Sequence, residues 1–404
     1  MDKHTEQVKI ENKKSNIPFL KDVFFCLLSA FGGPETHFSV MMDHLVMKKK
    51  YLSETELIEM VSLCNMLPGP TSTQLIISIG HKLGGPKLAL PAMLIWALPS
   101  LIIMSALSFL YVFLDRANFS DDALQFIAPM AVGFIFIAAM RMGKTVITSR
   151  MTAILFILSG LSTYFIRTPW SLPLALLLGG VVTVLLSREK GLWHKVSLRP
   201  PWAYLIVFLT IGIVSFLIAS SVENRIVDLF DSFYRFGYLV FGGGQVAVPL
   251  MYGDLVDINH YMTGQEFMAG YGLSQGIPGP MFSFSGYAGG LAARGEGIGF
   301  QIIGAATAGF AIFLPGILLI FFVYPIWESL KTIKGIRISL LGINAVAGGM
   351  VAGMAFLLLQ MNGFSPLNIT VTALAAILVL WGKIPTPIIV LATLAAGIML
   401  PIIN

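Results

Sequence analysis

The chain has 404 residues, of which 56% are hydrophobic and 12% charged, with a formal net charge of +5. Soluble domains carry about 25% charged residues, so this composition excludes an ordinary soluble enzyme or binding domain. The cations lie in short loops between apolar runs, which indicates membrane orientation rather than binding to nucleic acid. Cys26 and Cys64 lack the spacing of a metal site, so we expect free thiols, no metal and no cofactor.

The polar segment 1–16 begins the chain and is predicted to be a cytoplasmic tail, because no apolar region with a small-residue cleavage site follows it. Three short segments come next. Segment 17–31 stops at a Gly-Gly-Pro turn, segment 55–66 stops at a Pro-Gly-Pro turn, and segment 71–83 runs back. A membrane span needs about 20 apolar residues. These segments are therefore predicted to be Gly/Pro-broken short helices or re-entrant hairpins, and their shortness favours hairpins.

Long apolar segments fill the rest of the chain and predict membrane-spanning helices. Segment 202–222 has no counterpart in the other half and is predicted to be a linker helix. The remaining segments form two sets of four, at 86–114, 122–140, 151–166 and 169–187, and at 296–325, 338–360, 366–381 and 384–402.

An internal repeat relates the two broken blocks. Phe31-Gly32-Gly33 recurs as Phe241-Gly242-Gly243, and Pro68-Gly69-Pro70 recurs as Pro278-Gly279-Pro280, both with an offset of 210 residues. The register holds without a gap from residue 31 to residue 80, with 13 identities in 50 positions. Two motifs matched in one register indicate duplication. We predict a first repeat at 17–190, a loop and linker helix at 191–224, and a second repeat at 225–404.

The cationic loops predict how the repeats lie in the membrane. Three loops rich in Lys and Arg, at 141–150, 188–199 and 331–337, are expected to face the cytoplasm. The path between them places the N-terminus inside and the C-terminus outside. Lys48-Lys49-Lys50 corresponds to Ile258-Asn259-His260, so the same loop loses its lysines where the path puts it outside. This pattern predicts inverted-topology repeats, as in many secondary transporters.

The broken segments are the predicted transport site, since paired Gly/Pro-interrupted segments in two halves mark such sites. Helices that start after Pro34 and Pro70 present unpaired N–H groups to an anion. Thr71, Ser72 and Thr73 add hydroxyl donors, whereas the second half has Met281 and Phe282 before Ser283 and Ser285. The residues expected to bind substrate are Gly32, Gly33, Pro34, Glu35, His37, Pro68, Gly69, Pro70, Thr71, Ser72, Thr73, Gly242, Gly243, Gly244, Gln245, Pro278, Gly279, Pro280 and Ser283.

Fixed cations near apolar surface are candidate partners for a dianion, namely His81, Lys82, Arg141, Arg235 and Arg294. Each also has a plainer interpretation. Arg141 is more readily explained as an interfacial orientation signal, and Lys82 and Arg294 as side chains that reach the headgroups. Glu35, Glu56 and Glu266 are candidate carriers of a coupling proton, although Glu56 and Glu266 follow the capping-box pattern. Asn344 is expected to bond only to a neighbouring helix.

At these motifs the chain resembles the long, two-domain members of the chromate ion transporter family, over nearly its whole length. The matching residues are Phe31-Gly32-Gly33-Pro34 with His37, Leu67-Pro68-Gly69-Pro70, Gly80 with Gly84-Gly85, Phe241-Gly242-Gly243-Gly244 with Gln245, and Pro278-Gly279-Pro280. The resemblance implies an inner-membrane protein that exports chromate, interacts with sulfate, and uses a proton gradient or anion exchange. Gly244 stands where many halves of the family have proline, which predicts unequal binding by the two halves.

The sequence therefore predicts an all-α polytopic membrane protein that moves a tetrahedral oxyanion, chromate or sulfate, across the cytoplasmic membrane by secondary active transport. Its expected partners are the oxyanion, a coupling proton or counter-anion, and the lipid bilayer, with a homodimer left open. Three alternatives remain: a carrier of another small anion or solute on the same scaffold, a passive channel, and a membrane-embedded enzyme or sensor. The sequence contains no constellation of His, Asp or Ser that would support the enzyme.

Overall fold

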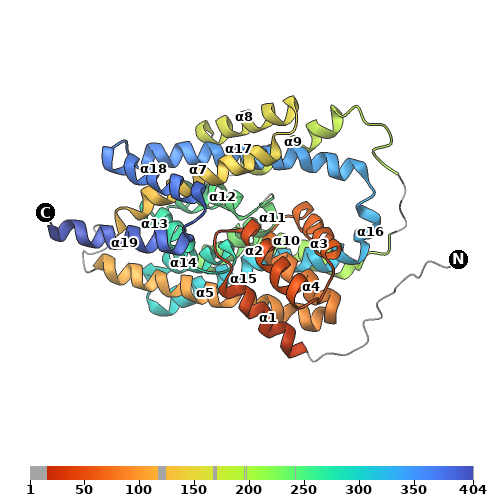
Figure 1. Ribbon diagram of the computed structural model, residues 1–404, viewed down its shortest axis with the longest axis horizontal. Coiled ribbons are helices and arrows are strands. Elements are labelled where there is room, and N and C mark those ends of the chain that lie inside the picture. The colour runs from red at the N-terminus through yellow and green to blue at the C-terminus, as the bar shows by residue number, and fades with distance from the viewer. Residues whose placement is uncertain are drawn as a thin grey trace.

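The structure is a computed structural model that describes residues 16–116, 124–166, 171–194, 196, 198–241 and 243–403. The side chains at 34–35, 116 and 400–403 lie outside this description. Segment 1–15 of the predicted tail and the candidate site residue Gly242 also lie outside it. All elements of the described part are helical, as the sequence predicts. Figure 1 shows several of them, among them α5, α17 and α19, running along the long axis of the molecule.

The helices of the first half are α1 (Asn16–Leu28), α2 (Pro34–Met41), η1 (Met42–Lys48), α3 (Glu54–Met66), α4 (Thr71–Gly84), α5 (Pro86–Arg116), α7 (Ile127–Val146), α8 (Arg150–Phe165) and α9 (Ser171–Leu185). The linker is α10 (Trp202–Ala219). The second half has α11 (Arg225–Leu239), η2 (Gly244–Val246), α12 (Ala247–Tyr252), η3 (Gly253–Ile258), α13 (Gly264–Ser274), η4 (Met281–Ser283), α14 (Phe284–Ala292), η5 (Arg294–Glu296), α15 (Ile298–Val323), η6 (Tyr324–Ile326), α16 (Trp327–Leu330), α17 (Lys334–Met361), α18 (Pro366–Trp381) and α19 (Thr386–Ile403).

Nine apolar helices coincide with the nine long segments predicted from hydropathy. Among the described residues, five are long and apolar enough to cross a membrane, at Pro86–Asp115, Ile127–Val146, Trp202–Ala219, Ile298–Leu330 and Lys334–Met361. Four shorter apolar helices correspond to α8, α9, α18 and α19. The prediction of an all-α polytopic membrane protein is confirmed.

The Gly/Pro-broken segments fold as short helices. Helices α1 and α3 have 13 residues each and α4 has 14, which at 1.5 Å per residue is about 20 Å, against a hydrocarbon core of about 30 Å. The turns that separate them need glycine, since Gly33 has φ 98° and Gly69 has φ 123°, a region that other residues rarely enter. Their length favours re-entrant hairpins over spans, which stays a prediction.

The two repeated blocks have the same local structure. Each contains a π-helix at the same position, η1 in the first and η3 in the second. The residues that follow, Lys50 and His260, share an unusual positive φ of 53° and 51°. Helices α3 and α13 both begin with a complete capping box, from Ser53 to Glu56 and from Thr263 to Glu266. Equivalent residues therefore fold equivalently, 210 positions apart.

The two halves of the chain are interleaved rather than packed as separate units. Helices α8 and α9 of the first half pack along α17 of the second, while α18 packs along α7 and α14 along α5. Small residues allow these approaches. A Cβ on Gly349 of α17 would lie 2.1 Å from the carbonyl oxygen of Phe156 in α8, so only glycine fits there. Helices of both halves thus contribute to one core, and the repeat boundaries 17–190 and 225–404 stay predictions.

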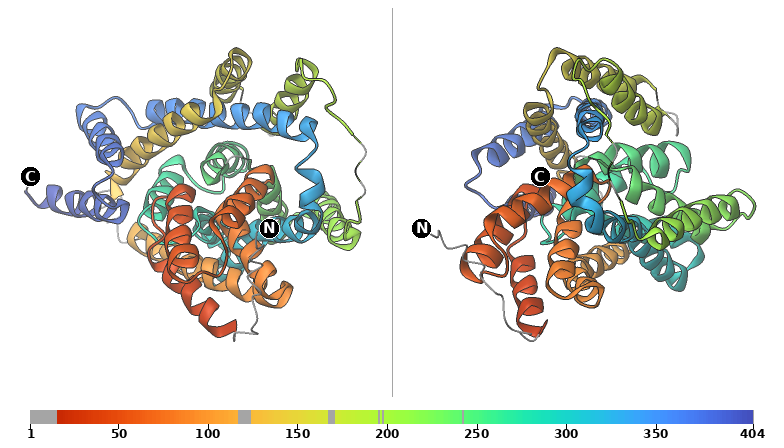
Figure 2. Two further views of the ribbon diagram at one scale, coloured as in Figure 1. Left: turned by 45° about the vertical axis from the view of Figure 1, so that its right-hand side comes forward. Right: turned by 90° about the vertical axis from the view of Figure 1, so that its right-hand side faces the viewer.

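The linker helix α10 lies at the edge of the bundle, where it contacts α11 and α15. Among its residues only Ser215 is buried. Figure 2 shows α7, α8, α9 and α17 along one side of the molecule, with α1, α4, α5 and α15 along the other. The exposed apolar surface of α10 is what a helix facing lipid requires.

Two of the loops predicted to be cytoplasmic lie together. The amide of Gly335 donates to the carbonyl of Leu192 at 2.9 Å, and His194 Nε2 lies 3.0 Å from Thr332 Oγ1. Lys331, in the same loop as Gly335, reaches Glu59 of α3 at 3.3 Å. These contacts bring segments 192–194 and 331–335 together, and the side of the membrane on which they lie stays a prediction.

Candidate functional site

A cavity of about 660 Å³ lies where the two halves meet. It is lined by residues at the start of α2, the ends of α3 and α13, the start of α4, and parts of α7, η2 and α17, with the α18–α19 turn beside them. Five of the predicted site residues line it, namely Gly32, Thr71, Arg141, Gly243 and Gln245. The breaks in the two halves thus converge on one space.

Arg141 provides the positive charge of this cavity. It is exposed to the open space, and its Nη2 donates to the carbonyl of Val379 at 3.1 Å. Among the described residues that line the cavity, Arg141 is the sole charged one, and no described carboxylate forms an ion pair with it. Helix α7 carries Arg141 to the cavity wall, and its two interpretations, as an anion ligand and as an orientation signal, both stay predictions.

Neutral polar groups form much of the remaining wall. Asn344 and Thr386 line the cavity, and Asn344 Oδ1 and Thr386 Oγ1 have no hydrogen-bond partner. Asn344 is expected to bond to a neighbouring helix, but its amide oxygen has no partner and faces the cavity instead. Buried polar atoms are usually satisfied, so unpaired ones facing a cavity mark a place for water or a ligand.

Asn65 and Gln275 also line the cavity, and neither was singled out from the sequence. They occupy equivalent positions, three residues before the first proline of each Pro-Gly-Pro turn. The repeat register would have identified them, because both halves have an amide side chain at this position, directly before the break. Thr36 and Tyr271 add two further hydroxyl groups.

The Pro-Gly-Pro turns bind each half to the other through the backbone. The amide of Gly69 donates to the carbonyl of Val240 at 2.7 Å, and the amide of Gly279 donates to the carbonyl of Ala30 at 2.8 Å. Gly69 and Gly279 are repeat equivalents, and so are Ala30 and Val240. The pair of hydrogen bonds is therefore reciprocal. It places each Pro-Gly-Pro turn against the Gly-Gly turn of the opposite half.

The Gly-Gly turns approach each other as well. A Cβ on Gly33 would lie 3.6 Å from Nε2 of Gln245, so the amide that follows the second turn lies against the first. Gly243 lines the cavity with φ 119°. Gly244 packs instead against Met281 and Phe282. Pro34 and Glu35 have undescribed side chains, and Gly242 lies outside the described residues.

The two halves differ at the helix start that follows each Pro-Gly-Pro turn. Helix α4 begins at Thr71 and runs for 14 residues, with no side chain capping its first amides. The second half begins there with a short 3-10 turn, η4. Thr71 faces the cavity, while Ser72, Thr73 and Ser283 are buried beside it. The first half therefore presents the helix N-terminus that suits an anion.

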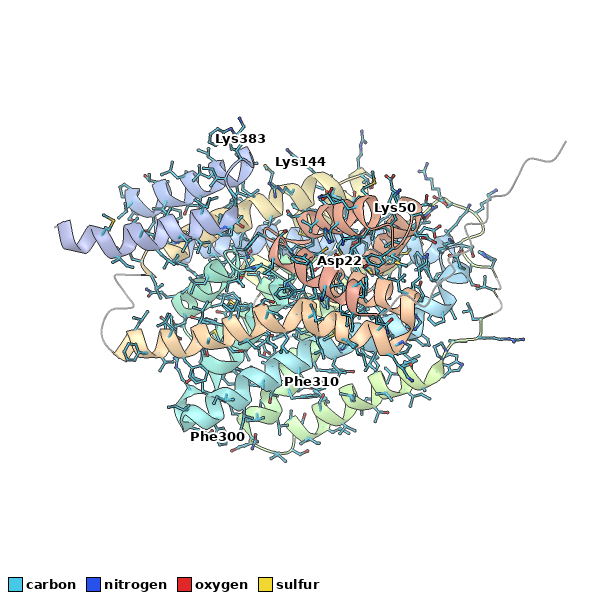
Figure 3. The ribbon with its side chains drawn as sticks, turned by 60° about the horizontal axis from the view of Figure 1, so that its bottom comes forward. Asp22, Lys50, Lys144, Phe300, Phe310 and Lys383 are labelled. Atoms are coloured by element: carbon cyan, nitrogen blue, oxygen red, sulfur yellow. The ribbon has the colours of Figure 1, made fainter. Side chains whose placement is uncertain are left out.

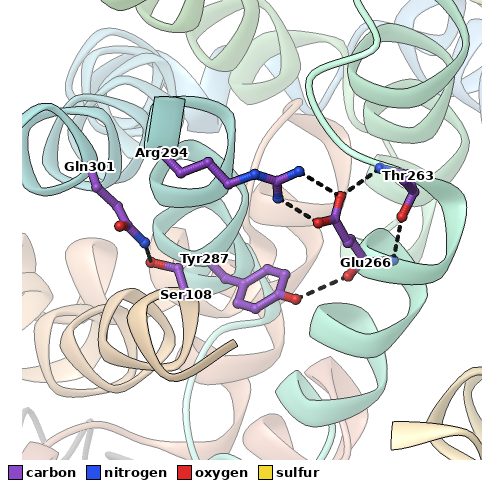
Figure 4. Close-up of polar contacts among 6 residues, drawn as sticks. All are labelled: Ser108, Thr263, Glu266, Tyr287, Arg294 and Gln301. Atoms are coloured by element: carbon purple, nitrogen blue, oxygen red, sulfur yellow. Dashed lines mark hydrogen bonds and ion pairs between the residues drawn. The ribbon is translucent and has the colours of Figure 1, made fainter. Parts of the chain in front are cut away.

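The other candidate residues lie away from the cavity wall. His37 is buried with its ring edge-on to Trp96, and His81 packs against Phe321 and Tyr324. Lys82 is paired with Glu56. Figure 4 shows Arg294 paired with Glu266, its Nη1 2.5 Å from Oε1. Both Glu residues thus serve helix caps and ion pairs.

Known proteins can now be compared with this chain. A family model described as "Chromate transporter" matches residues 20–184 and 227–399. The chain belongs to the chromate transporter family. A probable chromate transport protein of Synechococcus elongatus is 26% identical over 93% of this chain and 94% of its own. The chromate transport protein of Pseudomonas aeruginosa is 25% identical over 92% of this chain and 89% of its own.

The chromate transport protein of Cupriavidus metallidurans is 24% identical over 91% of this chain and 89% of its own. No solved structure matches this chain. The resemblance read from the motifs is thereby confirmed. Members of the chromate transporter family are transport proteins rather than enzymes, and with its apolar helices this chain is a multi-pass membrane protein.

Proposed function

We propose that this protein transports chromate or a related tetrahedral oxyanion, such as sulfate, through the cavity between its halves. The observation that carries the proposal is Arg141, a cation without a carboxylate partner among the described residues, at a cavity whose other described lining residues are uncharged. A fixed positive charge near apolar surface favours an anion and repels a cation. Hydrogen bonds to a charged group contribute about 1.5–3 kcal/mol each.

The size and donors of the cavity suit a partly hydrated anion. One water occupies about 30 Å³ of liquid, so 660 Å³ holds a five-atom anion together with water molecules. Thr71, Asn65 and Gln275 offer donors at several angles, as four oxygens at tetrahedral corners require. Chromate and sulfate share charge and shape, so these groups serve either.

The direction and energy source are part of the same proposal. Cationic loops assign the N-terminus to the cytoplasm and the C-terminus to the outside, which makes the two repeats inverted. Inverted repeats support alternating exposure of a central site. We therefore propose export from the cytoplasm, driven by a proton gradient or by anion exchange, with a homodimer as the candidate assembly.

Another small anion is the alternative cargo. Phe134, Ile137 and Val379 give the cavity an apolar wall beside Arg141, and an inorganic dianion gains nothing from apolar contact. A small organic carboxylate would use both surfaces. Competition between unlabelled anions of the two kinds separates these cargoes.

The test is counterflow in proteoliposomes. Vesicles loaded with unlabelled sulfate or chromate receive a trace of the labelled anion, and uptake is followed for the native chain, Arg141→Gln and Lys144→Gln. Lys144 lies on the same helix, is exposed and does not line the cavity. We expect saturable uptake, competed by both oxyanions, with the apparent affinity lowered about tenfold or more in Arg141→Gln alone.

Two results would contradict the proposal. If the folded native chain moves neither oxyanion, the cargo is wrong. If Arg141→Gln and Lys144→Gln both match the native chain, Arg141 does not bind the anion and the cavity is not the site.

A further inference from the structure

A second, smaller cavity of about 260 Å³ lies in the second half, between α11, η3, α17 and the ends of α8 and α9. Its charged lining comes from Arg235, Asp254 and Asp257. No described lysine, histidine or second arginine lines it. This cavity is separate from the oxyanion cavity and differs from it in kind, because carboxylates outnumber cations here.

Arg235 is shared between two carboxylates. Its Nη2 lies 3.3 Å from Asp231 Oδ2 and 3.8 Å from Asp254 Oδ1. Asp231 has a second partner, since Ser215 of the linker helix donates to its Oδ1 at 3.0 Å. Asp254 is only 8% exposed, and its Oδ2 has no hydrogen-bond partner. Asp231 thus has partners for both of its oxygens. Asp254 has the neutral side chains of Ser232 and Asn259 and the more distant Arg235 beside it, and its Oδ2 is left without a hydrogen-bond partner.

In the equivalent region of the first repeat, the carboxylate of Asp22 has close partners for both oxygens. Asp22 accepts a hydrogen bond from Tyr51 at 2.6 Å and lies 2.8 Å from His44 Nε2 and 3.0 Å from Lys49 Nζ. Figure 3 shows Asp22 among the helices of that half, while Lys50 extends outward. Three partners hold this carboxylate in its charged form.

At the corresponding positions of the two repeats, the carboxylate lies on different helices. Asp22 corresponds to Ser232 and His44 to Asp254, so the carboxylate has moved to the π-helix. Lys49 corresponds to Asn259, a neutral side chain, and the cation beside Asp254 is Arg235 at 3.8 Å. Burial without full compensation makes a carboxylate bind a proton more readily. The two repeats therefore contain one carboxylate with three close polar partners and one with an unpaired oxygen.

We propose that Asp254 is a proton-binding site of this transporter, distinct from the oxyanion site and coupled to it. The proposal rests on the proposed oxyanion transport. With a proton on Asp254, Arg235 pairs with Asp231 alone. Without the proton, Arg235 is drawn between two carboxylates on α11 and η3.

One segment joins the two sites. Residues 243–258 form η2, α12 and η3 in succession. Gly243 and Gln245 at its start line the oxyanion cavity, while Pro249 and Asp254 line the second. Its last part is a π-helix, a form that recurs at functional sites. A change in how Asp254 is held is thus transmitted along one short helix to the oxyanion wall, as a two-state element requires.

Charged and titratable groups around Asp254 bear on its proton. Asp231 and Asp228 on α11 and Asp257 on η3 are acidic, and Arg225 lies over the Tyr261 ring at 4.0 Å. Tyr238 and Tyr252 also line the cavity, whereas α17 contributes the apolar Met354 and Leu357. The surplus of acidic groups favours the protonated form of Asp254.

The experiment uses the full chain in proteoliposomes and compares native protein with Asp254→Asn and Asp43→Asn. Asp43 is a matched control because it lies on the π-helix of the first repeat with an exposed side chain paired to Lys48. Sulfate counterflow is measured at equal pH on both sides, and sulfate accumulation is measured under an imposed pH gradient in sodium-free buffer. We expect Asp254→Asn to retain counterflow and lose stimulation by the pH gradient, while Asp43→Asn retains both.

The outcomes separate this proposal from the proposed function. Absence of counterflow in the native chain contradicts oxyanion transport itself. If the native chain shows counterflow but its sulfate accumulation does not respond to the pH gradient, the proton site alone is overturned. The same holds if Asp254→Asn responds to the pH gradient as the native chain does. Stimulation by a sodium gradient in place of the pH gradient, lost in Asp254→Asn, also overturns it by making the site one for a metal cation.

A second measurement covers the case in which Asp254→Asn does not fold. Carbodiimides modify protonated carboxyl groups in apolar surroundings, so the native chain is treated with one across a range of pH and digested for mass spectrometry. Modification of Asp254 that falls as the pH rises, with Asp22 unmodified, is the expected result. An unmodified Asp254 at every pH contradicts the proposal.

Discussion

At the scale of single residues, charge is arranged in three distinct ways. Arg141 stands alone at a cavity, Asp254 is buried with incomplete compensation, and two Glu residues form ion pairs within their own hairpins. Sequence spacing does not distinguish these states. Each depends on which neighbour, often far away in the chain, lies within about 4 Å.

The two hairpin ion pairs offer a matched test of burial. Glu56 and Glu266 both complete a capping box, but the side chain of Glu56 is 41% exposed and that of Glu266 is 8% exposed. We expect Glu266→Gln to lower the free energy of unfolding by roughly 2 kcal/mol, below the value for a fully buried pair because Arg294 is partly exposed. Glu56→Gln should cost less than about 1 kcal/mol. Thermal unfolding in detergent compares them, and equal losses would contradict the role of burial.

At the scale of elements, the short helices are held by turns as much as by packing. The reciprocal bonds from Gly69 to Val240 and from Gly279 to Ala30 connect loops whose backbone amides have no helix to pair them. In a membrane an unpaired amide costs several kcal/mol. The amide in each Pro-Gly-Pro turn thus finds its hydrogen-bond acceptor in the opposite half. The cavity lies beside these two hydrogen bonds.

Adding a methyl group to these turns should disrupt the two reciprocal hydrogen bonds. A Cβ on Gly279 would lie 2.6 Å from Ser100 Oγ, and one on Gly69 would lie 2.8 Å from Gln74 Nε2, both at positive φ. We expect Gly69→Ala and Gly279→Ala to lower folded yield and counterflow, while Gly299→Ala, with open space around it, changes neither. Size-exclusion yield and counterflow are the measurements. Native behaviour in both turn variants would show that the turns tolerate a side chain.

At the scale of the whole molecule, the two repeats share one core. Helices α7, α8 and α9 of the first half pack against helices of the second, and the cavity proposed to bind the oxyanion takes walls from both halves. Neither repeat can enclose that cavity alone. A shared core also explains why the site lies at the junction, where both sets of broken helices meet.

The inverted orientation can be tested with one pair of equivalent residues. Lys50 and His260 are both exposed, share a positive φ and lie 210 positions apart. Cys26 and Cys64 are buried, so the native thiols should react slowly with a membrane-impermeant maleimide. We expect His260→Cys to be labelled in intact cells and Lys50→Cys only after permeabilisation. Labelling of both from the same side would contradict inverted repeats.

The sequence by itself determined the class of protein, the nine apolar helices, the breaks and the repeat register, because each depends on local composition and on spacing along the chain. Gly32, Thr71, Gly243 and Gln245, which lie at or directly after the predicted breaks, line the cavity, since glycine and proline breaks are recognisable without tertiary contacts. The structural equivalence of the capping boxes and π-helices follows from that same register.

Only the tertiary structure decided which charges are free. Arg141 and Asn344 line the cavity because α7 and α17 pass between the halves. Lys82 and Arg294 do not line it, since each forms an ion pair, with Glu56 and with Glu266 respectively. The reciprocal bonds of Gly69 and Gly279 join residues about 170–250 positions apart. Such pairings depend on how distant helices pack against each other, which cannot be read from the residues adjacent in the sequence.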